Sequence, residues 1–481
     1  MLNGGKTRGV LQKIAGLCLL LSLVGAGCTQ GPSAATVAAS KPVTINVWGV
    51  NEDESLYEPI FTDFHKLHPY VTIQYRSFNL DEYESQILNA LAEDRGPDVF
   101  LINNSWVGKY LPKIQPMPAS TQVAEQFVVG TLQKKVQYQL VAEPTVTLRD
   151  FKNNEPDVVS SDMLRTVNVS PTTDKTDYEQ RVMGIPLSVD TLGMYVNKDL
   201  LNAAGITTIP QTWDVFQTDV QKLVKQDDQG NILQAGAAIG TAYNVERAPD
   251  LISVLMMQNG ADMSAADGTP TFTTIPLALA NVRDEPPAYQ AMSFYTDFAD
   301  PSKAVYTWND KQPDSLEAFV EGKAAFFFGY AYDLPVITTR APKLNLEIAS
   351  LPQIQGNPEA NFANYWAWVV SKRTANSDVA WNLVNFMSTP DESAKYLAIA
   401  KLPAALKSQL GAQLNDEQIG VFAAQVLTAK SWYRGNDPKA ADDAFNTMIE
   451  TVVAGGSTAI PDAVHAASDK ISQTIIYGTT Q

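Results

Sequence analysis

The sequence predicts an α/β protein in which mainly parallel sheets carry helices on their faces. Strand-like and amphipathic runs alternate from Val43 onward, and this order implies crossover helices between parallel strands. A second alternating region begins at Gly184. The chain has 481 residues, which is too long for one ordinary domain, so two or more compact units are expected.

The first alternating region has the order βαβαβ. Residues 43–49 (VTINVWG) and 71–77 (VTIQYRS) have the alternating, β-branched composition of strands, and residues 54–67 between them have apolar side chains at helical spacing. Asn79 precedes an acidic residue by three positions, a pattern that predicts a helix start. A further strand is expected at 99–103 (VFLIN). This order predicts a parallel sheet.

The second region combines strands and helices in the same way, beginning with 184–198. Thr212 is the expected N-cap of a helix whose apolar residues form one stripe. Residues 118–182 show no clear period and are interpreted as a possible insertion. The remaining expected elements are a helix at 287–299, strands at 324–328, 346–350 and 365–370, and mostly helix from Asn376 onward.

The acidic composition limits the possible partners. The chain contains 52 acidic and 35 basic residues, which gives a formal net charge of −17. Nucleic acids are therefore not expected as partners, because phosphate binding requires clustered lysine and arginine. An anionic lipid surface would repel the folded body, so membrane association would require a separate anchor.

The first 27 residues have the organisation of a bacterial signal peptide. Basic residues precede the apolar run 14–24, which is too short to span a bilayer. Small residues then lead to Cys28, and this arrangement resembles a lipobox, although Gly25 stands where a branched aliphatic residue is usual. The resemblance implies cleavage before Cys28 and acylation of its thiol. A plain secretory signal is the alternative.

The cysteine count agrees with an anchor at this position. Cys18 and Cys28 are the two cysteines of the chain, and Cys18 lies inside the apolar run. After cleavage, the exported body would therefore have no disulfide bond and one thiol at its N-terminus. Residues 28–42 are small and nearly uncharged, and they are expected to form a flexible tether.

Several segments, taken in order, resemble the family 1 extracellular solute-binding proteins, the maltose- and oligosaccharide-binding group. They include TINVWG (44–49), GPDVFLINNSW (96–106), GIPLSVDTLGMYVNKDLLNAAGI (184–206) and YWAWVVSKRTANSDVAWNLVNFM (365–387). The resemblance covers most of 43–477, with 118–182 as the departure.

The resemblance implies a fold with two lobes, each discontinuous in sequence, and a hinge between them. The N-lobe is expected at 43–182 and 352–398, and the C-lobe at 183–351 and 399–481. The resemblance also implies a monomeric protein outside the cytoplasm, held to the membrane by its lipid, that binds a solute in the cleft between the lobes. The permease subunits of an ABC importer would be its partner.

Loops that follow the expected strands carry most of the candidate ligand-binding residues, because ligands in open α/β sheets bind at the carboxyl ends of strands. Aromatic faces together with acids and amides suit a sugar, which offers apolar C–H faces and a rim of hydroxyl groups. For each aromatic residue the alternative is core packing, and for each acid it is a solvated surface position. The candidates are Asn51, Glu52, Asn103, Asn104, Trp106, Asp190, Tyr243, Tyr330, Tyr332, Tyr365, Trp366, Trp432 and Arg434.

The sequence gives little support for a metal site or for an enzymatic activity. His65 and His68 lie three residues apart on an expected helix, but no further ligand is suggested nearby, so a solvated pair is expected and neither a metal nor a cofactor is predicted. The adjacent acids at 52–54 permit a glycosidase as a competing hypothesis, although adjacent carboxylates need not converge on a substrate. A peptide, a polyamine or another solute in the same fold is a further alternative.

Overall fold

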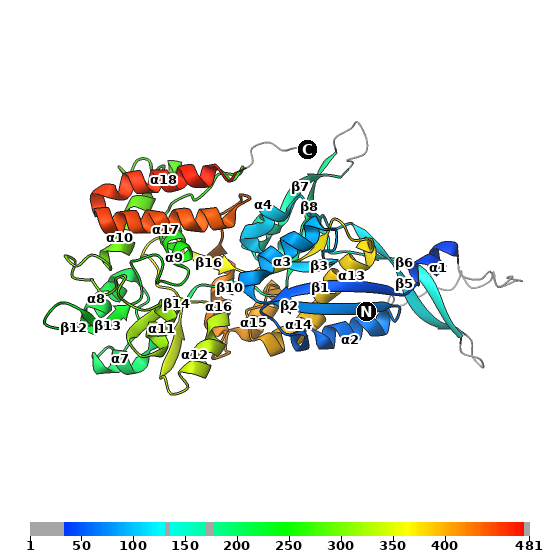
Figure 1. Ribbon diagram of the computed structural model, residues 1–481, viewed down its shortest axis with the longest axis horizontal. Coiled ribbons are helices and arrows are strands. Elements are labelled where there is room, and N and C mark those ends of the chain that lie inside the picture. Colours follow the sequence, from blue (N-terminus) through cyan, green and yellow to red (C-terminus); the bar gives the residue numbers. More distant parts are fainter. Residues whose placement is uncertain (1–32, 130–134, 170–176, 476–481) are drawn as a thin grey trace, which may run out of the picture.

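Two separate sheets, each with its own hydrophobic core, form the two lobes of the protein (Figure 1). The computed structural model describes residues 33–129, 135–169 and 177–475. The predicted signal peptide and Cys28 lie outside the described residues. Within the described residues, no helix combines the length and apolar character needed to cross a membrane.

The N-lobe contains a six-stranded mixed sheet, in which β17 (Trp366–Ser371) lies antiparallel to β3 (Val99–Asn103). The predicted βαβαβ order is confirmed, because β1 pairs in parallel with both β2 and β3. Helices on this lobe include α2, α3, α4, α13 and α14. Their bounds, with those of the other strands, are β1 Val43–Val50, β2 Val71–Phe78, β4 Ile114–Gln115, β9 Ile185–Pro186, α2 Glu58–Leu67, α3 Leu80–Ala92, α4 Val107–Tyr110, α13 Ser377–Met387 and α14 Pro390–Ala400.

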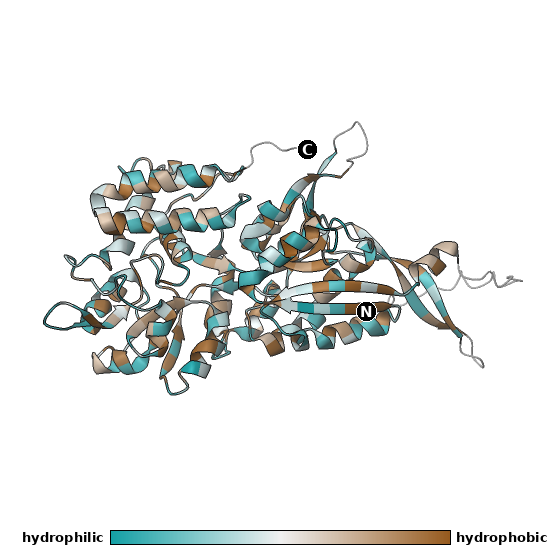
Figure 2. Cartoon of the chain, in the orientation of Figure 1, coloured by the Kyte–Doolittle hydropathy of each residue, from teal (hydrophilic) through white to brown (hydrophobic). Residues whose placement is uncertain are grey.

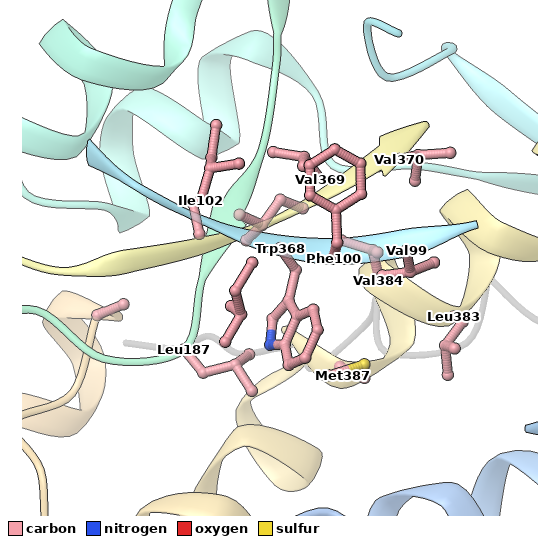
Figure 3. Close-up of a cluster of buried hydrophobic side chains, with 14 of the residues drawn as sticks. Val99, Phe100, Ile102, Leu187, Trp368, Val369, Val370, Leu383, Val384 and Met387 are labelled. Carbon is pink, nitrogen blue, oxygen red and sulfur yellow. The ribbon is translucent and has the colours of Figure 1, made fainter. Parts of the chain in front are cut away.

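Side chains on both sides of this sheet fill the N-lobe core (Figure 3). Trp368 points to one side, toward Leu187 and Met387, whereas Phe100 and Val369 point to the other. All five side chains are buried. Burying side chains of this size stabilises the fold by about 1.5–3 kcal/mol each.

The C-lobe contains a five-stranded sheet in the order β12-β13-β14-β11-β15. Thr212 caps α8 as predicted, with its hydroxyl accepting from the backbone N–H of Val215, and the predicted apolar stripe is buried. The elements are β11 Gly193–Asn197, β12 Lys225–Gln226, β13 Ile232–Ala237, β14 Ala324–Gly329, β15 Leu346–Ala349, α7 Lys198–Ala203, α8 Trp213–Leu223, α9 Ala248–Gln258, α10 Pro287–Asp297, α11 Ser315–Val320, α12 Leu334–Arg340, α17 Pro438–Gly455 and α18 Ile460–Ser472.

A small three-stranded sheet lies between the lobes. It consists of β10 (Asp190–Thr191), β16 (Asn361–Asn364) and β18 (Ala429–Lys430), with β16 in the middle. The chain passes between the two cores at 189–192, 362–363 and 429–432. These crossings form the hinge.

The crossings lie later in the chain than the boundaries expected at 183, 352 and 399. At the first boundary, β9 pairs with β17 and so belongs to the N-lobe sheet. At the third, α15 (Lys407–Gln413) and α16 (Gly420–Gln425) place apolar side chains in the N-lobe core. These segments belong to the N-lobe because of contacts with its sheet and its core, and the local sequence does not reveal those contacts.

The region 118–182, which is interpreted from the sequence as a possible insertion, forms two hairpins and two short helices. The first hairpin pairs β5 (Ser120–Val129) with β6 (Lys135–Pro144), and the second pairs β7 (Leu164–Asn168) with β8 (Tyr178–Val182). Between them lie α5 (Leu148–Asn154) and α6 (Asp157–Met163). The β5–β6 hairpin projects from the end of the N-lobe farthest from the C-lobe (Figure 1).

The expected flexible tether is wrong for residues 33–42. Ser33 caps a short helix, α1 (Ala34–Ala39), which lies against the β5–β6 hairpin. Thr36 is buried and Ala39 packs against the N-lobe core, so tertiary contacts order a segment whose small residues suggest disorder.

Two further expectations about polar residues need correction. Helix α3 begins after Asn79 as predicted, but the side chain of Asn79 does not cap it. The backbone N–H of Leu80 donates instead to the Oδ1 of Asn51, at 3.0 Å. His68 is buried, not solvated, and its Nδ1 lies 3.4 Å from the carbonyl oxygen of Ala124. Both corrections arise from contacts with segments distant in sequence.

Candidate functional site between the lobes

A small cavity lies where the N-lobe, the hinge sheet and the C-lobe meet. Its volume is about 50 Å³, enough for a few water molecules but well below the roughly 300–1,000 Å³ of typical ligand sites. The two lobes are therefore close together at this point. The cavity is lined by Asn103, Asn104 and Ser105 of the N-lobe, Phe362, Ala363 and Asn364 of the hinge, and Arg247, Pro249, Asp250, Ser253, Ser431, Trp432, Tyr433, Pro438, Ala441, Asp442 and Phe445 of the C-lobe side.

Amide and acid side chains line up along the hinge. Asn103 ends β3, and its Nδ2 donates to the Oδ1 of Asn364 at 2.7 Å. Asn364 in turn stands opposite Asp190 in the pairing of β16 with β10. Backbone register thus brings together polar residues that lie far apart in sequence.

An arginine held by two acids forms the C-lobe wall of the cavity. Arg247 precedes α9 with a left-handed backbone (φ 53°). Its Nε and Nη2 donate to the two carboxylate oxygens of Asp250, each at 2.7 Å, and its Nη1 lies 3.4 Å from Asp442. The hydroxyl of Tyr330 donates to Asp250 at 2.7 Å. A bidentate pair of this kind fixes the guanidinium plane.

A buried carboxylate connects the lobes beside the cavity. Asp162 of α6 is fully buried and accepts from the Nδ2 of Asn104 at 3.1 Å and the hydroxyl of Tyr365 at 2.9 Å. It also accepts from the Oγ of Ser431 and the Nη2 of Arg434, each at 2.6 Å. Ser431 and Arg434 belong to the segment that enters the C-lobe after β18, so this cluster joins the third crossing to the N-lobe.

Aromatic side chains lie on both sides of the hinge. In the N-lobe, Trp106 and Trp366 are half-buried and meet edge to face, with 5.2 Å between ring centroids. In the C-lobe, Tyr332 is 44% exposed and stacks on the buried Tyr330 at 5.3 Å, while Tyr243 is 71% exposed. The exposed faces can take a ligand, whereas the ring of Tyr330 is part of the C-lobe core.

The two candidate acids are engaged in hydrogen bonds within the protein. Asp190 accepts from the backbone N–H groups of Thr191 (2.8 Å), Ala331 (3.1 Å) and Tyr332 (3.3 Å). Burial nevertheless raises the pKa of Asp190 to about 7. Glu52 accepts from the hydroxyls of Tyr57 and Tyr396, and burial raises its pKa as well.

The structure thus separates the candidate residues into groups. Asn103, Asn104 and Trp432 line the cavity, and Tyr365 and Arg434 meet at Asp162. Trp432 is largely interior, because its Nε1 donates to Ser253 at 3.0 Å and its ring stacks on Phe445. Asn51 and Glu52 hold N-lobe elements in place and do not line the cavity.

Several residues of this region were not among the candidates, and they include Arg247, Asp250 and Asp162. Arg247 and Asp250 lie three residues apart at the start of an apolar helix, which is a weak signal of an ion pair. Asp162 lies in the segment 118–182, whose sequence shows no helix or strand periodicity. Among the described residues, no three or more histidine, aspartate or glutamate side chains are grouped so as to hold a metal ion.

Comparisons with known proteins agree with this architecture. The sequence pattern of the bacterial extracellular solute-binding proteins matches residues 49–394. The multiple sugar-binding protein of Streptococcus mutans is 26% identical over 230 residues, which are 47% of this chain and 52% of that protein. The chain therefore spans about half the length of the curated relatives it matches.

Solved structures share the fold at low sequence identity. A cyclo/maltodextrin-binding protein in complex with maltotetraose superimposes with a TM-score of 0.66 at 16% identity, covering 92% of this chain and 99% of that one. The maltose-binding protein MalE of Listeria monocytogenes, in complex with maltose, gives 0.63 at 16% identity, covering 90% and 99%. The expected two-lobed α/β fold is confirmed.

Proposed function

Because the chain belongs to the bacterial extracellular solute-binding proteins, we propose that it binds a sugar or oligosaccharide between its lobes and delivers it to an ABC importer. The observation that carries the proposal is the placement of partly exposed aromatic rings in both lobes near the hinge: Trp106 and Trp366 follow the cavity-lining residues Asn104 and Asn364 closely in sequence, and the backbone N–H of Tyr332 donates to Asp190 of β10. Relatives and structural neighbours that bind sugars support the same cargo class.

In this proposal the rings of Trp106, Trp366 and Tyr332 stack on the C–H faces of the sugar, and amides near the hinge bind its hydroxyl groups. Opening about the hinge sheet would enlarge the space between the lobes to admit the ligand. Contacts from both lobes would then favour the closed arrangement. Binding without chemical conversion is sufficient for this role.

Calorimetric titration of the purified protein with mono- and oligosaccharides, peptides and polyamines tests the cargo class. Saturable heat with at least one sugar is expected, and a ligand at 100 times its Kd should raise the free energy of unfolding by about 2.7 kcal/mol. Binding of a peptide or a polyamine alone would contradict the proposal. Chromatography of the same sugar mixtures would reveal products if the protein were an enzyme.

The membrane anchor is a second part of the proposal. Acylation of Cys28 would hold the protein outside the cytoplasm at the membrane surface. The wild-type protein should then sediment with membranes, and the Cys28→Ser variant should be released or left unprocessed. A Cys28→Ser protein that is cleaved normally and stays on the membrane would exclude lipidation at this residue.

A further inference from the structure

The outer end of the β5–β6 hairpin exposes four apolar side chains. Phe127, Val128 and Val129 of β5 are 40%, 58% and 39% exposed, and Val136 of β6 is 56% exposed. Figure 2 shows this end of the hairpin as hydrophobic, although it projects away from the body of the N-lobe. Clustered apolar side chains on a projecting element mark an interaction surface.

Both faces of the hairpin carry apolar side chains at this end. Val128 stands opposite Val136 across the strands, so these two side chains share one face. Phe127 and Val129 lie on the other face, opposite Gln137 and Lys135, because side chains alternate along a strand. A protein partner with a flat surface would cover one face, whereas a lipid phase that surrounds the hairpin end covers both.

The same end differs in charge from the rest of the protein. Residues 126–129 and their strand partners 135–138 contain no carboxylate, and Lys135 is their one charged residue. The whole chain, in contrast, has a formal net charge of −17. The end of the hairpin is therefore a part of the surface that anionic lipids would not repel, and Lys135 would be attracted to their headgroups.

The path of the chain brings the proposed anchor to this hairpin. Helix α1 lies against β5 and β6, and Ser33 caps its first turn. Cys28 precedes Ser33 by five residues, which span at most about 18 Å when fully extended. Acyl chains on Cys28 would therefore hold the membrane close to α1 and the hairpin, at the end of the molecule away from the C-lobe (Figure 1).

We propose that the end of the β5–β6 hairpin, formed by Phe127–Val129 and Val136, inserts into the membrane surface beside the lipid anchor. This inference rests on the proposed acylation of Cys28. Each valine or phenylalanine side chain that enters the acyl region increases the equilibrium constant for insertion about tenfold or more. Two contacts with the membrane fix the orientation of the N-lobe, which one flexible lipid attachment does not.

Fluorescence of the acylated protein on vesicles tests the insertion. After signal cleavage and acylation, a Val128→Cys variant has one free thiol, which takes an environment-sensitive dye. On vesicles of phosphatidylethanolamine and phosphatidylglycerol, we expect the emission to shift to the blue and to be quenched by nitroxide on the lipid acyl chains. Val136→Cys provides a second position on the same face.

Matched variants show whether the apolar residues cause the insertion. With the dye at position 136, Phe127→Thr, Val128→Thr and Val129→Thr together should return the dye to water, while the protein stays on the vesicles through its lipid. Threonine is chosen because it retains the preference for strands. The control is Leu277→Thr with Val282→Thr, two residues that are 92% and 75% exposed in the C-lobe, and it should leave the signal unchanged.

Other outcomes overturn the proposal in distinguishable ways. A protein that is acylated and bound to vesicles but whose dye remains in water excludes insertion of the hairpin while leaving the anchor intact. Shielding of the dye that requires added permease would instead identify a protein as the occupant. A mass spectrum without the acyl group would remove the anchor and, with it, this inference.

Discussion

At the scale of single residues, Asp190 shows how burial ties stability to pH. Its carboxylate is buried at the hinge, and its pKa is raised to about 7, compared with about 3.9 in an unfolded chain. Because the folded state favours the protonated form, its contribution to stability is complete below about pH 4 and is lost as the pH rises to about 7.

An Asp190→Asn variant removes this dependence. We expect the free energy of unfolding of the wild type, relative to the variant, to fall by up to about 4 kcal/mol between pH 4 and pH 7 and then to level off. The substitution also changes the free energy of unfolding by an amount that does not depend on pH, because the amide nitrogen of asparagine cannot accept the N–H bonds that a carboxylate oxygen accepts. Urea unfolding at several pH values measures the difference, and a difference independent of pH would contradict the prediction.

Variants of two neighbouring tyrosines, Tyr330 and Tyr332, test ligand binding and core packing separately. Tyr332 is 44% exposed, so Tyr332→Ala should weaken sugar binding about tenfold to a hundredfold and change stability little. Tyr330 is buried and bonded to Asp250, so Tyr330→Ala should lower the free energy of unfolding by about 3–5 kcal/mol. Titration and thermal melting of both variants would check this, and equal loss of stability in both would show that Tyr332 is also core.

At the scale of elements, α6 and the third crossing are joined by a buried polar contact between the lobes. Arg434 donates to the fully buried Asp162, and the neighbouring loop lies directly on α4. A Cβ on Gly108 would collide with the carbonyl oxygen of Gly435, so glycine is needed for this approach. The contact fixes how the loop enters the C-lobe.

Breaking this ion pair should therefore be costly. Asp162→Ala leaves four donors without their acceptor, and we expect a loss of about 3–5 kcal/mol in the free energy of unfolding. The matched control is Asp443→Ala, which removes the exposed pair with Lys439 on α17 and should cost less than about 0.5 kcal/mol. Similar losses in the two variants, measured by urea unfolding, would contradict the inference.

At the scale of the whole molecule, the two lobes are in contact beside the small cavity at the hinge. A space of about 50 Å³ does not hold a sugar, so a sugar that binds at this cavity would enter while the lobes are farther apart. Small-angle scattering should accordingly show, at the mass of a monomer, a larger radius of gyration without sugar than with it. An identical radius in both states, with a sugar shown to bind, would exclude a hinge motion.

The sequence predicted the fold well because its signals are local. Alternating strand and helix patterns gave the elements of both lobes, and the cap at Thr212 was correct. Distant pairing was not visible in these patterns, so the lobe boundaries lay too early and residues 33–42 were taken for a tether. The contact of α1 with the hairpin, together with the burial of Thr36, orders that segment.

The candidate site was predicted less completely, because contact with solvent depends on tertiary packing. Tyr330 and Tyr332 are two residues apart, yet one is core and the other is 44% exposed. Asp162 accepts from donors in three distant segments, and no local pattern distinguishes it from a surface acid. Residues that act through such networks can be identified only from the structure.

The position of β17 in the N-lobe sheet has a consequence for folding. This strand pairs with β3, so Asn103 meets Trp366, a partner more than half the chain length away. The ribosome must make the whole C-lobe segment between them before the N-lobe can complete its sheet. Contacts of such long range slow folding. The nascent N-lobe therefore stays incomplete for most of its synthesis, which leaves a long interval in which the chain can be bound by chaperones or threaded, still unfolded, through a translocation pore.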